Sequence, residues 1–271
     1  MPFRLLNDGS TLQRAMDKAF NDLIGKITAI YQENLRVFSK EQDDHVKHLK
    51  KVFDRCRKFG ISLNPKVSTF GIDEGKLLGH IVSKEGIRID PERAQAINII
   101  AAPHNVASLQ SFFGKINFIQ RFIPNLAELA KPLNALLKKD AKFVWDKSYE
   151  TSFVNLKKAI STAPILACPD YSKEFMIYSY ASEDTIVGVL LQKNNENHEQ
   201  PIVFMSKNLR DAELKYTTTE KKAYALVKAL KHFKTYIGYS KIKAFVPYQA
   251  AKDVLSQANG IGVRGNWISW I

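Results

Sequence analysis

Apolar positions in the first third of the chain alternate between helical and strand-like spacing. One helix is expected near the start and a second over residues 42–58, where Gly60 is placed to end it. Between them, ITAIY and LRVF flank a polar triplet at 32–34, the pattern of strand, tight turn and strand. SLNPKVSTF and KLLGHIVSKEGIRI are expected to form further short strands. The first helix has an apolar stripe and two expected caps: Leu12, Ala15, Met16, Ala19 and Phe20, with Ser10 and Thr11.

The middle third has a helical pattern. Asp90 followed by Pro91 is a typical helix start. A second helix is predicted from an apolar stripe that ends at Pro124, and two more are predicted over 125–139 and 147–161. The stripe consists of Leu109, Phe112, Phe113, Ile116, Ile119 and Ile123.

The last third returns to strands. FMIYSY, TIVGVLLQ and PIVFMSK read as three successive strands, followed by a long amphipathic helix with Thr219 as its expected cap. KIKAFV reads as a fourth strand, before a short helix. Three strands, a helix and another strand predict a mixed sheet, so the fold class is α+β or α/β.

Composition excludes several classes of protein. The 271 residues, 45% of them hydrophobic, suit about two ordinary globular domains. No apolar run approaches the ~20 residues of a membrane span, and the first ten residues do not resemble a secretory signal. Cys56 and Cys168 are too few for a disulfide framework. We therefore expect an intracellular chain, cytoplasmic or nuclear, with no membrane contact.

The net charge points to a partner. Lys and Arg number 40 against 27 acidic residues, which gives a formal net charge of +13. An excess of this size favours a polyanionic partner and carries no information about the fold.

Several segments, in order, resemble the Pol polyprotein of gypsy-type LTR retrotransposons. MPFRLLNDGSTLQRAMD is similar to the family's MPFGLxNAPATFQRxMD, and ITAIYQENLRVFSK to its Tyr-x-Asp-Asp hairpin. LGHIVSKEGIRIDPER resembles the primer-grip hairpin, and DAELKYTTTEKKAYALVKAL the RNase H helix. The resemblance implies a partial reverse-transcriptase palm at 1–87, a helical thumb and connection at 88–162, and a truncated RNase H-like domain at 163–271, with Phe3 and Gln13 as remnants of the nucleotide pocket.

The family's polymerase chemistry uses Mg²⁺ ions held by carboxylates, and this sequence departs from that pattern. Glu33 and Asn34 stand where the family has two Asp, and the family's third carboxylate lies upstream of the matching segment. Magnesium requires anionic oxygen ligands, so we expect no bound metal there. The alternative for both residues is a solvated hairpin turn.

The RNase H-like positions depart in the same way. Tyr180 stands at the first Asp of the family's Tyr-Thr-Asp-Ala-Ser, and Lys222 at the second Glu of its Thr-Glu-Lys-Glu. Pro247, Tyr248 and Gln249 stand where the family has Thr-Asp-His, and the last ligand would lie beyond Ile271. An ammonium group repels a dication, so both centres are expected to be inactive and no cofactor is expected to bind.

Other clusters have ordinary explanations. Asp43, Asp44 and His45 resemble metal ligands but suit the first turn of a helix. Glu183 and Asp184 could replace the lost Asp, although a turn facing water is favoured.

The substitutions at the metal-ligand positions do not argue against binding of nucleic acid. Lys115, Gln120 and Arg121 lie where the family's thumb grips the duplex backbone, and phosphate contacts need only cations. The partner implied is an RNA–DNA hybrid or a duplex. A solvated helix face is the alternative, and it also applies to a second set of cations: Lys221, Lys222, Lys228, Lys231 and Lys234. Three hypotheses remain: an inactive fragment of a retrotransposon polyprotein, a non-catalytic nucleic-acid-binding module, and an unstable chain with no present role.

Overall fold

The computed structural model describes residues 7–39, 41–139 and 141–245. The chain divides into two compact units, residues 1–72 and 73–271. Each unit is described by itself. None of the helices in the described ranges is long and apolar enough to cross a membrane.

The first unit is two helices and a two-stranded ribbon. Helix α1 begins at Asp8, so the expected caps Ser10 and Thr11 lie inside the helix, and that prediction was wrong. The predicted strand SLNPKVSTF is also wrong, because residues 62–70 form turns and irregular backbone. The elements are α1 (Asp8–Phe20), β1 (Thr28–Tyr31), β2 (Asn34–Val37), the 3-10 turn η1 (Gln42–Asp44) and α2 (His45–Phe59).

The second helix of this unit ends as its sequence predicts. Gly60 has a φ of 65°, a left-handed conformation that glycine adopts without strain. The next residue, Ile61, donates its N–H to the carbonyl of Cys56 at 2.9 Å. Among the described residues of this unit the hydrophobic core is small, with six buried members: Met16, Ala19, Phe20, Ile27, Val52 and Cys56.

The second unit opens with an antiparallel three-stranded sheet, β3 (Gly75–Leu77), β4 (His80–Ser83) and β5 (Gly86–Ile89). Strand β5 also pairs with Leu166 through two backbone hydrogen bonds of Ile87, at 2.7 and 2.8 Å. Gly86 makes this pairing possible, since it has a φ of 137° and any Cβ there would collide with the carbonyl oxygen of Leu166.

A layer of helices follows in the sequence: α3 (Pro91–Asn98), α4 (Val106–Asn117), the 3-10 turn η2 (Gln120–Phe122), α5 (Leu126–Ala135) and α6 (Lys147–Ser161). The Asp90 side chain caps α3 by accepting from the N–H of Glu92, as predicted. The predicted continuous helix up to Pro124 is wrong, because α4 ends at Asn117. After Asn117 the backbone hydrogen bonds span three residues, as in a 3-10 helix: the Phe122 N–H donates to the Ile119 carbonyl at 3.0 Å. The tighter winding still buries Ile119, Phe122 and Ile123.

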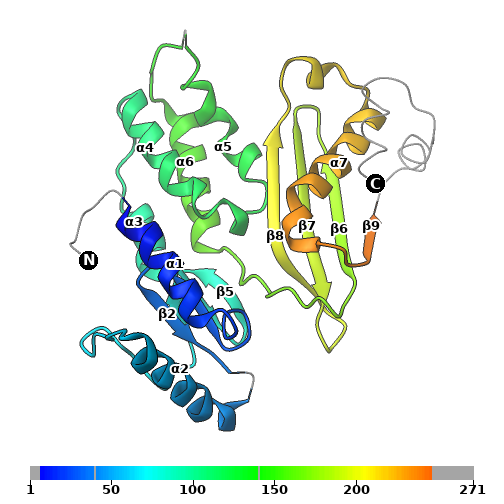
Figure 1. Ribbon diagram of the computed structural model, residues 1–271. Helices are drawn as coiled ribbons and strands as arrows, with labels where there is room; N and C mark the ends of the chain where they lie inside the picture. The colour runs from blue at the N-terminus through cyan, green and yellow to red at the C-terminus, as the bar shows by residue number, and fades with distance from the viewer. Residues whose placement is uncertain (1–6, 40, 140, 246–271) are drawn as a thin grey trace. The chain divides into compact units, whose positions relative to one another are not determined.

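The last part is a four-stranded mixed sheet with one long helix on it (Figure 1). The strand order is β8-β7-β6-β9, in which β6 and β9 run parallel and the other pairs antiparallel, so the predicted mixed sheet is confirmed. The elements are β6 (Phe175–Ala181), β7 (Thr185–Lys193), β8 (Glu199–Asn208), the 3-10 turn η3 (Asp211–Lys215), α7 (Thr218–Ile237) and β9 (Ile242–Phe245).

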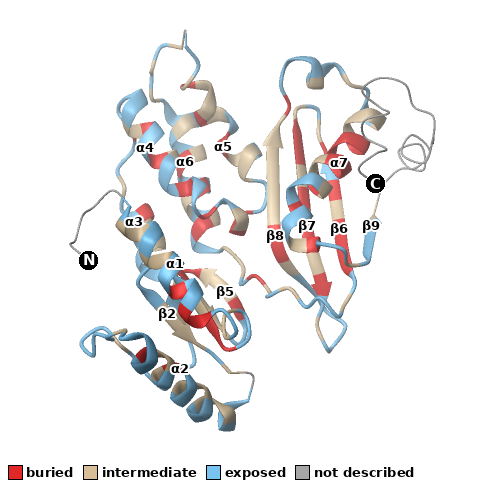
Figure 2. Cartoon of the chain, viewed as in Figure 1, coloured by how far each residue is buried: buried red, intermediate tan, exposed pale blue. Residues whose placement is uncertain are grey.

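Helix α7 forms the core of this sheet with the strand residues that face it (Figure 2). Its cap is Thr217 rather than the predicted Thr219: the Thr217 hydroxyl accepts from Glu220 N–H while the Glu220 carboxylate accepts from Thr217 N–H. At Gly188, a Cβ would lie 3.0 Å from that of Ala229, so the helix packs closely on β7.

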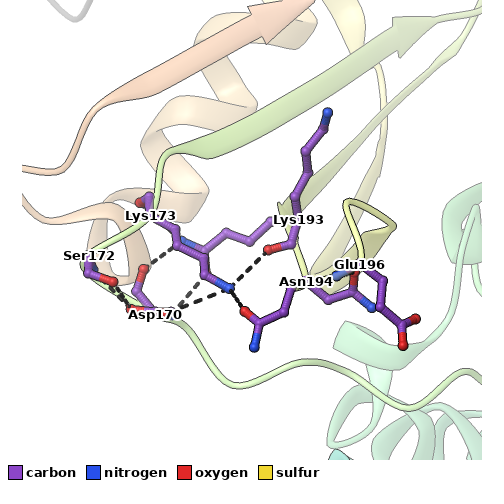
Figure 3. A network of polar contacts seen from close by, with 8 residues as sticks. Asp170, Ser172, Lys173, Lys193, Asn194 and Glu196 are labelled. Atoms are coloured by element: carbon purple, nitrogen blue, oxygen red, sulfur yellow. Dashed lines mark hydrogen bonds and ion pairs between the residues drawn. The ribbon is translucent and has the colours of Figure 1, made fainter.

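A polar network holds the chain that enters β6 against the turn between β7 and β8 (Figure 3). Lys173 donates to the Lys193 carbonyl at 3.4 Å and to the Asn195 side chain at 2.8 Å. Gln192 is buried and donates to the carbonyl of Asp170 at 2.7 Å. These bonds connect segments about twenty residues apart and fix the start of the sheet.

Candidate nucleic-acid interface

The hairpin that resembles a polymerase centre ends in an exposed turn. Gln32 and Glu33 make the turn, and Asn34 is the first residue of β2, paired with Tyr31. Both Glu33 and Asn34 are exposed. Gln13, predicted as part of a nucleotide pocket, accepts from Gln32 N–H at 2.6 Å and so connects α1 to the turn. Phe3, its predicted neighbour, lies outside the described residues.

The second set of degenerate positions is divided between two faces. Side chains alternate along a strand, and Ala181 belongs to the core that α7 completes, so Tyr180 points to the opposite face and is 56% exposed. Lys222 is buried on α7, only 7% exposed. Gln249 lies outside the described residues. The sheet therefore does not bring Tyr180 and Lys222 together on one face.

Of the two acidic residues that follow Tyr180 in the sequence, one forms an ion pair and the other is exposed. Asp184 forms an ion pair with Lys131 of α5, which corrects the expectation that it faces water. Lys131 holds the pKa of the Asp184 carboxyl below its usual value. The Glu183 side chain is exposed, as expected, and its carbonyl accepts a hydrogen bond from Lys221 at 2.5 Å.

These donor sets do not fit a pair of magnesium ions. An exposed Glu beside an amide, and a phenol and an ammonium group on different faces, cannot supply several converging carboxylates. Over the described ranges, no three His, Cys, Asp or Glu side chains are grouped so that they could hold a metal. Asp43 and Asp44 lie in η1, and Asp44 pairs with Lys47 at 3.0 Å.

The second unit does contain a basic groove, a cavity of about 650 Å³ between η2, β8 and α7. Four cationic side chains line it: Arg121, Lys207, Lys228 and Lys231. None of its lining residues within the described chain is Asp or Glu. Burial, together with the nearby charge of Lys207, lowers the pKa of Lys228, because loss of water and a like charge both destabilise the protonated ammonium group.

Two of the three predicted binding residues line this groove. Gln120 is exposed, and Arg121 is half-buried with its guanidinium carbon 5.1 Å from the Phe122 ring. The Nε of Arg121 is buried and has no hydrogen-bond partner among the described residues. Lys115 is exposed on α4 and is not one of the lining residues.

Sequence reasoning treated the α7 cations as a separate face and missed Lys207. Lys228 and Lys231 lie one turn apart on α7, and the fold places them in one groove with Arg121, more than a hundred residues away in sequence. Lys207 comes from the end of β8, where it also bonds Glu213 at 3.0 Å. The only sequence signal for Lys207 was its place at the end of a strand.

An aromatic stack lies beside Arg121. His80 stacks on Phe118 with ring centroids 4.8 Å apart. The guanidinium carbon of Arg93 lies 4.1 Å from the centroid of the same Phe118 ring. Phe122 is fully buried, whereas Phe118 is 43% exposed and lines the groove. Gly79 leaves room for the stack, since a Cβ there would lie 2.9 Å from the Arg93 guanidinium.

Comparison with known proteins identifies this architecture. Residues 145–244 match the RNase H-like domain found in reverse transcriptase. The chain is 34% identical over 238 residues to the retrovirus-related Pol polyprotein from transposon 297 of Drosophila melanogaster, covering 88% of this chain and 22% of that protein. It is 28% identical over 221 residues to the transposon Tf2-7 polyprotein of Schizosaccharomyces pombe, covering 80% and 17%. The chain thus spans about a fifth of the length of these relatives.

Solved structures show the same fold. The foamy viral protease-reverse transcriptase in complex with RNA/DNA hybrid has a TM-score of 0.81 at 23% identity, covering all of this chain and 37% of that one. The same viral protein in complex with dsDNA has a TM-score of 0.84 at 24% identity, covering all of this chain and 56% of that one.

The fold class is therefore that of reverse transcriptase with an RNase H-like domain, as predicted. The chain's homologues are LTR retrotransposon Pol polyproteins, and residues 145–244 match the RNase H-like domain found in reverse transcriptase. The predicted domain limits at 87 and 162 stay predictions.

Proposed function

We propose that this chain is a retrotransposon-derived fragment that binds nucleic acid without catalysing polymerisation or RNA cleavage, inside the cell, in the cytoplasm or nucleus. The observation that carries the proposal is the basic groove, where the described lining residues include four cations and neither Asp nor Glu. Phosphate groups need only positive charge at a suitable distance, so binding survives changes that remove metal ligands.

The relatives agree with this proposal. The foamy viral enzyme of similar fold was solved with an RNA/DNA hybrid and with dsDNA. A duplex or hybrid is therefore the partner proposed for this chain. The loss of catalysis is proposed from the donor sets at Glu33, Asn34, Tyr180 and Lys222, which do not suit magnesium.

Salt dependence tests the binding. Fluorescence anisotropy with a labelled hybrid or duplex at several salt concentrations should give a steep negative slope of log affinity against log salt. Arg121→Ala should weaken binding about tenfold and make the slope shallower by about one. Lys193→Ala is the matched control, because Lys193 is exposed at the far end of β7 and does not line the groove. A slope near zero, or equal losses in the two variants, refutes the binding proposal.

Catalysis is tested separately. The purified chain should show no primer extension and no RNA cleavage with Mg²⁺. Activity that Glu33→Gln abolishes would overturn the proposal that the polymerase centre is inactive.

A further inference from the structure

One cation of the basic groove already has an acidic partner within the chain. Glu213 of η3 does not line the groove, but its carboxylate bonds the ammonium group of Lys207, which does, at 3.0 and 3.3 Å. The Glu213 side chain is 19% exposed and that of Lys207 40%, so water screens this pair less than a pair on the open surface. Part of the positive charge of the groove is therefore neutralised from behind its lining.

The carboxylate of Glu213 is held in place by other donors. It accepts from the Arg210 N–H at 3.1 Å, and the Tyr224 hydroxyl of α7 donates to it. Burial disfavours its charged form, but the hydrogen bonds from Tyr224 and Lys207 outweigh burial and keep the pKa of the carboxyl below its usual value. Glu213 is therefore charged at neutral pH and fixed beside Lys207.

The charge of Glu213 also reaches a second lysine of the groove. Burial, and then the charge of Lys207, lower the pKa of Lys228, and the charge of Glu213 acts against both. A phosphate group in the groove is attracted by these lysines and repelled by Glu213 over a similarly short distance. The affinity of the groove for a polyanion depends on the balance of the two effects.

We propose that Glu213 competes with nucleic acid for Lys207. In the free chain the carboxylate pairs with this ammonium group, and a phosphate that enters the groove replaces the carboxylate as its partner. The inference rests on the proposed function and adds to it a residue that limits the affinity. Because the phosphate gains this cation only by separating an existing pair, binding is weaker than it would be if Lys207 had no partner.

Removal of the competing charge tests the proposal. Glu213→Gln keeps the shape of the side chain and an oxygen that accepts from Arg210, and anisotropy with a labelled hybrid or duplex should show about three- to fivefold tighter binding. Glu199→Gln is the matched control, because Glu199 accepts from the Tyr178 hydroxyl at 3.0 Å and does not line the groove. This control changes the net charge equally and should leave the affinity nearly unchanged.

A second substitution separates competition for one cation from a general effect of charge. In a Lys207→Met background, Glu213→Gln should lose most of its gain in affinity, because the cation for which Glu213 competes is absent. A gain of equal size with and without Lys207 overturns the inference. Weaker or unchanged binding in Glu213→Gln also overturns it, since that is the result of a purely structural role.

Carbon NMR of the unmodified chain gives a readout that decides the question even if Glu213→Gln does not fold. The carboxyl signal of Glu213 should move when a duplex is added, because its ammonium partner leaves, while the signal of Glu199 should stay. An unmoved Glu213 signal in a chain that binds the duplex overturns the inference. If salt-dependent binding and the Arg121 effect persist in that case, the proposed function stands without it. If neither hybrid nor duplex binds, both fail.

Discussion

The ribbon of β1 and β2 and the sheet of β6 to β9 both carry positions that resemble metal-binding motifs, yet the two regions differ in how far they bury the polar side chains at these positions. A two-stranded ribbon buries little by itself, so Glu33 and Asn34 remain in water. Among the described residues, the hydrophobic core of the four-stranded sheet and α7 has sixteen buried members against six in the first unit, and Lys222 is buried as well. The comparison shows that both replaced residues on the small scaffold stay solvated, whereas on the larger one Lys222 joins the packing under the sheet and Tyr180 remains exposed on the other face.

The largest expected effect separates the stabilities of the two regions. Phe233 is fully buried between α7 and β7, so Phe233→Ala should cost about 3–5 kcal/mol of unfolding free energy. Val52→Ala should cost less, about 1–2 kcal/mol, because it removes fewer buried atoms from a smaller core. Hydrogen exchange read peptide by peptide should show each loss of protection confined to its own unit.

If either substitution lowers protection equally in residues 8–59 and 175–245, the two regions unfold as one and the comparison fails. A chain without any cooperative transition would instead support the third hypothesis, an unstable fragment with no present role.

The next effect is a pH dependence confined to the second unit. Burial, and then the charges of Arg121 and Arg93, lower the pKa of His80 from 6.5 to about 4. The unfolded chain therefore takes up this proton at a higher pH than the folded chain, and stability falls as pH drops from about 6.5 to about 4. The full difference corresponds to about 3 kcal/mol.

Urea unfolding of the second unit at pH 7 and pH 4.5 measures this loss. His80→Phe keeps a ring against Phe118 and removes the titrating group, so its stability should change less over the same interval. An unchanged pH profile in this variant would show that other groups cause the acid sensitivity.

The smallest expected effect concerns two ion pairs. Asp184→Asn should lower stability by about 0.5–1 kcal/mol, since the Lys131 to Asp184 pair is partly shielded, with the aspartate side chain 33% exposed. Asp54→Asn in α2 is the control, because its pair with Arg57 is 57% and 78% exposed and should contribute close to nothing. Thermal melts of both variants measure the difference, and equal shifts would mean that partial burial adds no stability.

Much of the local structure was predictable because it depends on neighbouring residues. The Asp90 and Pro91 pair, the left-handed Gly60 and the alternating strands of the last sheet all appear where the pattern places them. Caps were less certain, since several hydroxyl residues compete at each helix start, and Thr217 rather than Thr219 forms the reciprocal pair with Glu220.

The candidate site was predictable only in part. Arg121 and Gln120 were singled out on one helical segment, whereas Lys228 and Lys231 appeared as an unrelated face of another helix. Whether two cationic faces meet depends on how α7 and η2 pack against β8, and no local pattern contains that information.

The amino-acid sequence by itself determined the chemistry available to this chain: a strong positive charge, and amide, phenol and ammonium groups where the motifs that it resembles have acids. Only the tertiary structure decided which of those groups meet. It points Tyr180 away from α7, pairs Asp184 with Lys131, and brings cations of η2, β8 and α7 together in one groove. Side-chain identity is set at each position separately, whereas distances between remote positions follow from the packing of whole strands and helices.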